Sequence, residues 1–303
     1  MRRAYGYRPN VAATKRFNRT LAPFSKVCAA LDNNTDRSAY CYRLEAHCRG
    51  VDRLDANHQE WLGACVGFGS GGATDKTQAG DVCERGEAEL FYPVSGGASY
   101  ALARDAVGDR GRHAGTYGSA AAKGIARGTL RELDYGDFDL RTYDPSYIQR
   151  LTRTGVPARY WTEAEKCPGR CVLLTTWQQA RACLQNYMGI FTCSNIGYNE
   201  QRDNDGFMRR RGSWAHCMEV CGYRGERTGP RFRSGRRGFM LQQTWFDGWA
   251  GDDNYWPEDA PKQSFWITVY DMQAHLDQGD TYAVLGIDGV KRKNYRKLAK
   301  VGR

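Results

Sequence analysis

Residues 59–69, QEWLGACVGFG, place Cys65 directly behind two small residues and six positions after Gln59. A cysteine attacks as its thiolate, and the backbone amides at a helix N-terminus favour that charged form. The small residues Gly63 and Ala64 leave space for a substrate carbonyl. The same pattern also fits a cysteine that is simply buried, because free cysteine is among the most frequently buried residue types.

Two later segments supply polar groups that such a thiol would need. His216 lies inside WAHCMEVCGY, a predicted strand, where its context decides between a proton-transfer role and a structural one. Gln243 precedes Trp245 in LQQTWFDGWA, and a second tryptophan follows at Trp249. Taken alone, this third segment is an aromatic strand end.

In this order, the three segments resemble the papain/cathepsin family of cysteine peptidases. That family's first block is Gln, five residues and Cys, with Gly and a small residue before the Cys and an aromatic residue three positions after it. Its second block is a strand histidine followed by apolar residues and Gly-Tyr, and its third is Asn-Ser-Trp with another Trp four residues on. The resemblance covers roughly residues 50–285, and the matching residues are Gln59, Gly63, Ala64, Cys65, Phe68, His216, Gly222, Tyr223, Gln243, Thr244, Trp245 and Trp249.

The resemblance implies a role for each of these polar residues. Cys65 attacks a carbonyl carbon and His216 protonates the leaving amine. The side-chain amide of Gln59 and the backbone N–H of Cys65 stabilise the charge on the carbonyl oxygen. Gln243 orients the histidine, in the position where the family has an asparagine that is one methylene shorter.

A substrate-binding wall is also implied by the resemblance. The turn GTYG, residues 115–118, resembles the family's glycine-containing wall, with Gly118 expected to pair with a peptide backbone and with Tyr117 and Trp245 beside it. Only 58 residues precede Gln59, and they lack the family's helical inhibitory pattern of interspersed Glu, Arg, Phe and Asn. An active enzyme would therefore need another restraint.

Hydrophobic periodicity predicts a helical first half and a strand-rich second half. Helices are expected over 21–31, from 65 to the glycine-rich stretch 69–75, over 86–106 with an interruption at Pro93, over 119–130 and over 177–188. Strands are expected over 190–195, 214–223, 238–245 and 264–272. The predicted fold class is therefore α+β and papain-like, with a helical half, an antiparallel barrel-like half and the active-site cleft between them.

Composition sets broader limits. The 303 residues are 41% hydrophobic and 26% charged, with a formal net charge of +10, as in a globular protein. We find no apolar run of the length that spans a bilayer and no standard secretory signal, which favours a cytoplasmic or virion-associated protein in an unknown host. The expected division is a basic arm at 1–45, a peptidase domain at 46–285 and a basic tail at 286–303.

Eleven cysteines fit either five disulfides with one free thiol or eleven thiols. Cys167 and Cys171, in KCPGRC, approach the spacing of metal ligands, but a turn with a local bridge or two thiols explains them better. No metal and no cofactor is expected. His47, His58, His113 and His275 have no motif around them and are interpreted as surface or structural residues.

Three functions follow from these patterns. The first is a papain-like cysteine endopeptidase that acts on peptide or protein substrates. The second is a papain-fold structural or binding component of an assembly such as a viral or phage particle, whose basic ends contact neighbouring proteins, nucleic acid or another acidic surface, although such ends can equally be solvated tails. The third is a thiol amidase that acts on peptidoglycan or an isopeptide bond, because the thiolate chemistry does not specify the amide.

Overall fold

The computed structural model describes residues 5–31, 36–85, 91–111, 113–225, 236–245, 249 and 257–287. The helices in these residues are α1 (Val11–Asn18), α2 (Phe24–Val27), η1 (Ala29–Leu31), α3 (Cys41–Arg49), α4 (Cys65–Arg85), α5 (Gly96–Asp105), α6 (Gly118–Arg127), α7 (Pro145–Thr154), α8 (Ala158–Ala164), α9 (Trp177–Gln185) and α10 (Val269–Leu276). The strands are β1 (Ala39–Tyr40), β2 (Gly169–Leu173), β3 (Ile190–Ser194), β4 (His216–Arg224), β5 (Gly238–Gln242), β6 (Ser264–Thr268) and β7 (Thr281–Ile287).

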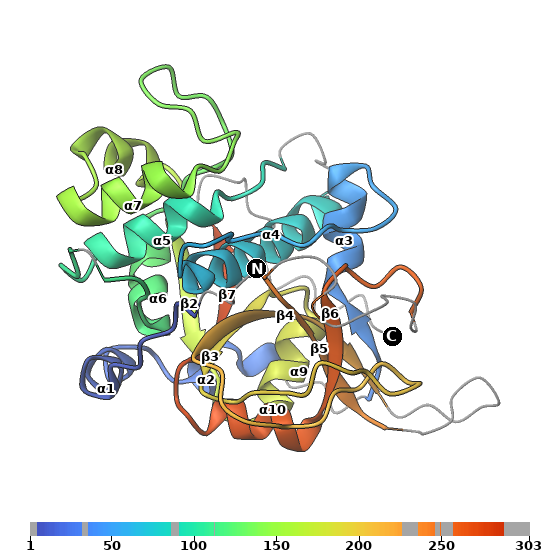
Figure 1. Cartoon of the computed structure of the whole chain (residues 1–303). Coiled ribbons are helices and arrows are strands. Elements are labelled where there is room, and N and C mark those ends of the chain that lie inside the picture. The colour runs from blue at the N-terminus through green and yellow to red at the C-terminus, as the bar shows by residue number, and fades with distance from the viewer. Residues whose placement is uncertain are drawn as a thin grey trace.

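The strands form a sheet in the order β2-β7-β3-β4-β5-β6, with β1 paired to β4. Every one of these strand pairs is antiparallel. Helices α9 and α10 cover one face of the sheet, and α4 runs along the other face (Figure 1). The predicted α+β fold class is confirmed.

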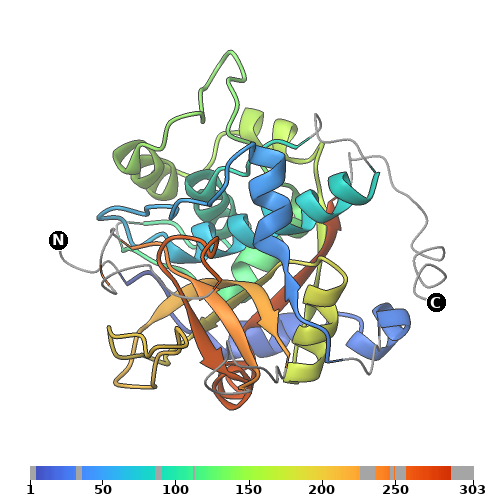
Figure 2. The same ribbon diagram turned by 90° about the vertical axis from the view of Figure 1, so that its right-hand side faces the viewer.

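The helical half lies on the opposite side of α4 from the sheet, as Figures 1 and 2 show. Its core is apolar and aromatic and includes Phe68, Tyr100, Leu102, Ile148, Leu151, Tyr160 and Trp161. Helix α7 begins where the sequence provides both an acceptor and a preset backbone angle, because the Asp144 carboxylate accepts from two backbone amides and Pro145 occupies the first turn. Helix α4 is thus packed on both sides, which fixes the residue at its start.

Helix α4 does not stop in the glycine-rich stretch 69–75, as periodicity predicted, but continues to Arg85. The glycines lie where the helix backbone meets its neighbours. A Cβ on Gly67 would overlap the backbone of Gly96, and one on Gly69 would lie 3.0 Å from the sulfur of Cys217. Tertiary packing therefore overrides the low intrinsic helix propensity of glycine here.

The predicted strand over 264–272 is correct only in its first part. β6 ends at Thr268, where a capping box starts α10: the Thr268 hydroxyl accepts from the Asp271 amide at 3.1 Å and donates to the Asp271 carboxylate at 2.7 Å. The chain then returns as β7, a strand that the sequence pattern did not indicate.

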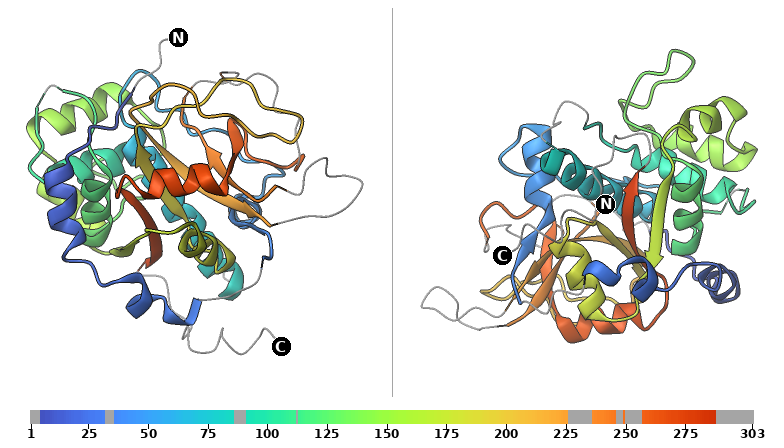
Figure 3. Two further views of the ribbon diagram at one scale, coloured as in Figure 1. Left: turned by 90° about the horizontal axis from the view of Figure 1, so that it is seen from below. Right: turned by 180° about the vertical axis from the view of Figure 1, so that it is seen from behind.

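The N-terminal region packs against the rest of the chain through α1, which lies beside α6 (Figure 3). Thr14 hydrogen-bonds Ser119 at 3.1 Å. The Asn18 side chain donates to the Gly279 carbonyl at 2.9 Å and accepts from Tyr282 at 2.7 Å. Part of the region predicted as a basic arm is therefore anchored, whereas residues 288–303 of the predicted tail lie outside the described residues.

A cluster of buried charges joins α3, α4 and β4. The ammonium of Lys76 lies 2.8 Å from the Glu45 carboxylate and 2.9 Å from that of Glu219, and all three side chains are almost fully buried. Arg49 bridges Glu45 and Asp75. Burial alone would raise the pKa of Glu45, but Lys76 and Arg49 outweigh it and lower that pKa.

None of the helices in the described part of the chain is long and apolar enough to cross a membrane.

Candidate functional site

Cys65 is the first residue of α4 and is fully buried. The backbone groups of Gly6, Val66 and Cys217 near its sulfur favour the thiolate and act to lower the pKa of Cys65. Burial and the neighbouring Cys217 thiol act in the opposite direction, and together they raise the pKa of Cys65 well above its ordinary value. The thiol is positioned as a helix-terminal nucleophile, but in this state it is held protonated.

His216 and Gln243 come from adjacent strands and form a hydrogen-bonded pair. His216 starts β4, Gln243 directly follows β5, and both side chains are fully buried. The Nε2 atom of His216 lies 2.5 Å from the Oε1 atom of Gln243. Because an amide oxygen only accepts, this contact assigns the proton of the neutral ring to Nε2, and Nδ1 is then the ring nitrogen without a proton.

Trp245 covers this pair rather than lining an open wall. Its ring centroid lies 4.5 Å from that of His216, and the side chain is only 3% exposed. Its other neighbours include Trp214, at a centroid distance of 5.0 Å, and Tyr5, at 5.6 Å with the rings nearly perpendicular. The tryptophan therefore keeps water from the histidine and fixes the plane of its ring.

Gln59 connects the loop before α4 to the segment after β5. Its Oε1 atom accepts from the Thr244 hydroxyl at 2.6 Å, and its Nε2 atom donates to the Leu62 carbonyl at 3.1 Å. Its backbone N–H also donates to the Thr244 carbonyl, at 2.9 Å. The side-chain amide that was predicted to serve an oxyanion therefore also holds the turn before Cys65.

The wall next to α6 is built differently from the expectation. The amides of Gly118 and Ser119 bond the carboxylate of Asp280, at 2.8 and 2.9 Å, while Tyr117 is the half-buried residue just before the helix. A Cβ on Gly118 would lie 2.8 Å from this carboxylate. The strand-like backbone pairing is made by Thr116, whose N–H donates to Gly6 at 2.9 Å.

Residues 5–8 of the chain, which we call the cleft segment, lie across this site. The amide of Tyr7 donates to the Ala215 carbonyl at 3.2 Å, next to His216, and the amide of Arg8 donates to the Thr116 carbonyl at 2.7 Å. A Cβ on Gly6 would overlap the Gly63 carbonyl, so the approach is too close for any other residue. The protein's own N-terminal residues therefore fill the space over Cys65, which no sequence motif indicated.

The cysteines and the remaining histidines do not add a metal site. All eleven cysteines are thiols, including Cys167 and Cys171. In the described ranges, no group of three or more His, Cys, Asp or Glu side chains is arranged to hold a metal ion. His113 lies 2.7 Å from Asp109, and His275 lies 2.7 Å from the Tyr198 hydroxyl.

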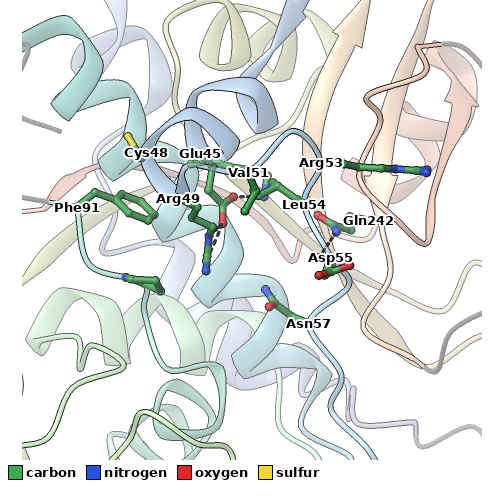
Figure 4. Close-up of a pocket in the computed structure, with 12 residues that line it drawn as sticks. Glu45, Cys48, Arg49, Val51, Arg53, Leu54, Asp55, Asn57, Phe91 and Gln242 are labelled. Carbon is green, nitrogen blue, oxygen red and sulfur yellow. Dashed lines mark hydrogen bonds and ion pairs between the residues drawn. The ribbon is translucent and has the colours of Figure 1, made fainter. Parts of the chain in front are cut away.

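A hollow of about 470 Å³ lies away from Cys65, His216 and Gln243, which are not among its lining residues. It is lined mainly by charged and polar side chains, and Figure 4 shows them around the end of α3. They include Glu45, Arg49, Arg53, Asp55, Asn57, Lys76 and Gln242. Glu45, Arg49, Lys76 and Asp55 are engaged in ion pairs, such as Arg49 with Glu45 and Asp75, so the hollow borders the buried charge cluster.

Comparison with known proteins gives a likeness in structure. No family model matches the sequence, and no curated protein matches it. The structure is similar to xylellain, a cysteine protease from Xylella fastidiosa, with a TM-score of 0.56 and 14% identity over 96% of this chain and 99% of the other. It is also similar to procathepsin B S9 from Trypanosoma congolense, with a TM-score of 0.55 and 11% identity over 94% of this chain and 87% of that one.

A third similar structure is the ragweed allergen Amb a 11, a cysteine protease in its proform, with a TM-score of 0.53 and 14% identity over 97% of this chain and 84% of the other. At such low identity the likeness concerns the fold. The chain therefore has the fold of the papain-like cysteine proteases.

Proposed function

We propose that this protein is a papain-like cysteine endopeptidase whose nucleophile is Cys65. The observation that carries the proposal is the hydrogen bond between His216 and Gln243. These two residues lie on the sheet side of the site, and Cys65 lies at the start of α4. This arrangement leaves Nδ1 of His216 to take the thiol proton and to return it to the leaving amine.

The reaction would proceed in two stages. The Cys65 sulfur attacks the peptide carbonyl carbon, His216 protonates the departing amine, and a thioester remains. Water, deprotonated by His216, then hydrolyses the thioester and restores the thiol. The backbone amide of Cys65 and the side-chain amide of Gln59 are the proposed donors to the oxyanion, and such a donor typically contributes about 10²- to 10³-fold in rate.

Gln243 is proposed to orient His216 in the place of a shorter asparagine. The 2.5 Å contact supports this role, because the extra methylene does not prevent the amide oxygen from reaching the ring. Trp245 shields the contact from water and supports a stable orientation.

The filled cleft favours a second candidate, a papain-fold component that no longer cleaves. The raised pKa of the buried Cys65 thiol and the cleft segment over it both describe a silent state. The endopeptidase and the component that does not cleave differ in one property: whether the Cys65 thiol becomes reactive once the cleft segment leaves the cleft.

The test is labelling with an epoxide electrophile that traps papain-like thiolates, read by peptide mass spectrometry. The chains compared are wild type, Tyr7→Ala, which shortens the side chain that anchors the cleft segment, and Tyr7→Ala with His216→Ala. The peptidase proposal expects rapid labelling confined to Cys65 in Tyr7→Ala and its loss when His216 is also replaced. Slow labelling of Cys65 in Tyr7→Ala that His216→Ala leaves unchanged would favour the silent component.

A further inference from the structure

Cys48 and Cys83 are a facing pair of thiols where α3 meets the last turns of α4. Their sulfur atoms lie 3.7 Å apart, although the two residues are 35 positions apart in the sequence. The Cys83 sulfur also lies 3.9 Å from the carbonyl oxygen of Leu44, one helical turn before Cys48. Both thiols are only partly buried, whereas Cys65 is fully buried and lies about 27 Å away along α4. The pair is therefore separate from the nucleophile and open to solvent.

The buried charge cluster holds the two helices in the register that brings these thiols together. Glu45 of α3 pairs with Lys76 of α4 at 2.8 Å, and Arg49 pairs with Asp75 at 3.1 Å. On the other side of this contact, Cys48 packs against a small apolar cluster made of Ala79, Val82 and Phe91. Two groups held in contact by a rigid frame react with each other as if at very high concentration. The fold therefore favours a bond between these two sulfurs over a bond from either one to a separate molecule.

The hollow beside α3 gives a small reagent access to Cys48. Cys48 is one of the residues that line this space of about 470 Å³, and Figure 4 shows it among the side chains around the hollow. Arg49, Arg53 and Asp55 also line it, so charges of both signs face a reagent that enters. A small disulfide that carries carboxylate and ammonium groups matches this lining in size and charge.

We propose that Cys48 and Cys83 are a redox-active pair, which low-molecular-weight disulfides convert into an intramolecular disulfide between α3 and α4. The Cys48 sulfur attacks the S–S bond of the reagent, which releases one thiol and leaves a mixed disulfide on Cys48. The Cys83 sulfur then attacks the Cys48 sulfur and releases the second thiol. Two electrons pass from the cysteines to the reagent, and the two cysteine protons end on the released thiols. This inference does not depend on the peptidase function.

The bond requires little movement of the backbone. A separation of 3.7 Å is a van der Waals contact, so side-chain rotation can bring the sulfurs to the bonding distance of about 2.05 Å. The closed loop would run from residue 48 to residue 83 and would contain both Gln59 and Cys65. Closing such a loop constrains the unfolded chain and should raise the Tm by about 5–10 °C. The disulfide would thus stabilise the segment that carries the nucleophile without consuming the Cys65 thiol.

A second facing pair of cysteines shows why exposure matters. Cys193 and Cys217 are directly opposite each other on β3 and β4, but both are fully buried. A Cβ on Gly69 of α4 would lie 3.0 Å from the Cys217 sulfur, so the helix covers this pair closely. A reagent in solution reaches Cys48 through the hollow but does not reach Cys193 or Cys217 in the folded protein.

The test is incubation of the full chain with oxidised glutathione. Burial and the adjacent Cys83 thiol raise the pKa of Cys48 to about 12, which slows the exchange, so the incubation is carried out at about pH 8.5. The remaining thiols are alkylated in denaturant, and the monomer is analysed by peptide mass spectrometry without reduction. We expect one cross-linked peptide pair that contains Cys48 and Cys83, with Cys65 recovered in alkylated form. The Tm should rise by about 5–10 °C and return to its starting value with dithiothreitol.

Two serine variants serve as a matched pair. Cys48→Ser should abolish both the cross-link and the rise in Tm, whereas Cys171→Ser, at another partly buried cysteine, should keep both. The cross-link itself is measured in the wild type, so the test does not depend on the folding of a variant.

Recovery of Cys48 and Cys83 on separate alkylated or glutathione-bound peptides at every ratio of oxidised to reduced glutathione would overturn the inference. A cross-link that forms only after urea has unfolded the chain would also overturn it, because the folded arrangement would not be its cause. Complete cross-linking without any change in Tm would refute the stabilising effect of the disulfide.

Discussion

Replacing Gly6 by alanine should open the cleft by a steric route that leaves the catalytic residues unchanged. The added methyl group would overlap the Gly63 carbonyl, which is backbone and cannot rotate away. The cleft segment must therefore move, and it is held by backbone hydrogen bonds of 2.9 Å from Thr116 to Gly6, 2.7 Å from Arg8 to Thr116 and 3.2 Å from Tyr7 to Ala215.

The size of the effect follows from these three hydrogen bonds. Each contributes about 0.5–1.5 kcal/mol net, so their combined loss is about 1.5–4.5 kcal/mol, or one to three powers of ten in the population of the open state. If labelling of Cys65 requires opening, its rate constant should increase by about that factor. Part of the loss is recovered when water solvates the released groups, a compensation that these net values already include.

The assay is the second-order rate constant for modification of Cys65 by an epoxide, followed by peptide mass spectrometry. Val11→Ala, which truncates an exposed side chain at the start of α1, is the control and should label like wild type. An unchanged rate in Gly6→Ala with an unchanged Tm would refute the reasoning, since the overlap would then have been relieved without opening. Equal acceleration at the other buried cysteines would show general loosening and would also contradict it.

Three further predictions concern other parts of the chain. In the Gly6→Ala chain, whose cleft is open, Gln243→Ala should lower kcat by about 10²-fold with a smaller effect on KM, because His216 loses its orienting acceptor. If kcat is the same with and without Gln243→Ala, Gln243 has no part in the mechanism. Burial lowers the pKa of His275 from 6.5 to about 3, so its contribution to stability is complete above about pH 6.5 and is lost as the pH falls, by about 3 kcal/mol at pH 4.5. Urea unfolding should show a shallower pH dependence for His275→Gln than for wild type, and identical slopes would contradict this. Lys76→Met should lower the free energy of unfolding by about 3–5 kcal/mol, because Glu45 and Glu219 lose their shared cation; Lys15→Met, at an exposed position, is its control, and a loss equal to the control's would refute it.

The parts of the site that could be predicted are those that local sequence encodes. Gln59 and Cys65 lie within one short segment, and His216 and Gln243 each lie in an alternating aromatic stretch that indicates a strand. Hydrophobic pattern was also sufficient for the fold class, since helices and strands occupy different halves of the chain.

The parts that could not be predicted depend on contacts between distant backbones. Asp280 binds the start of α6 from 162 residues away, and an isolated aspartate before a strand has no sequence signature. The pairing of Gly6 with Thr116 is made by backbone groups, which any sequence carries. The length of α4 was underestimated because glycine lowers helix propensity, whereas the close packing that favours glycine is visible only in three dimensions.

The anchoring of α1 determines how a competitor would meet the cleft segment. Residues 5–8 are separated by only two residues from a helix whose Thr14 and Asn18 are hydrogen-bonded to the main body of the protein. A ligand on such a short tether has an effective local concentration in the millimolar range or above. Dilution of the protein does not lower that concentration, so a free peptide at micromolar levels competes at a disadvantage of about a thousandfold. Cutting the chain between the cleft segment and α1 would abolish the advantage, and weakening the contacts of Thr14 and Asn18 would reduce it by lengthening the tether, in both cases without altering any residue in the cleft.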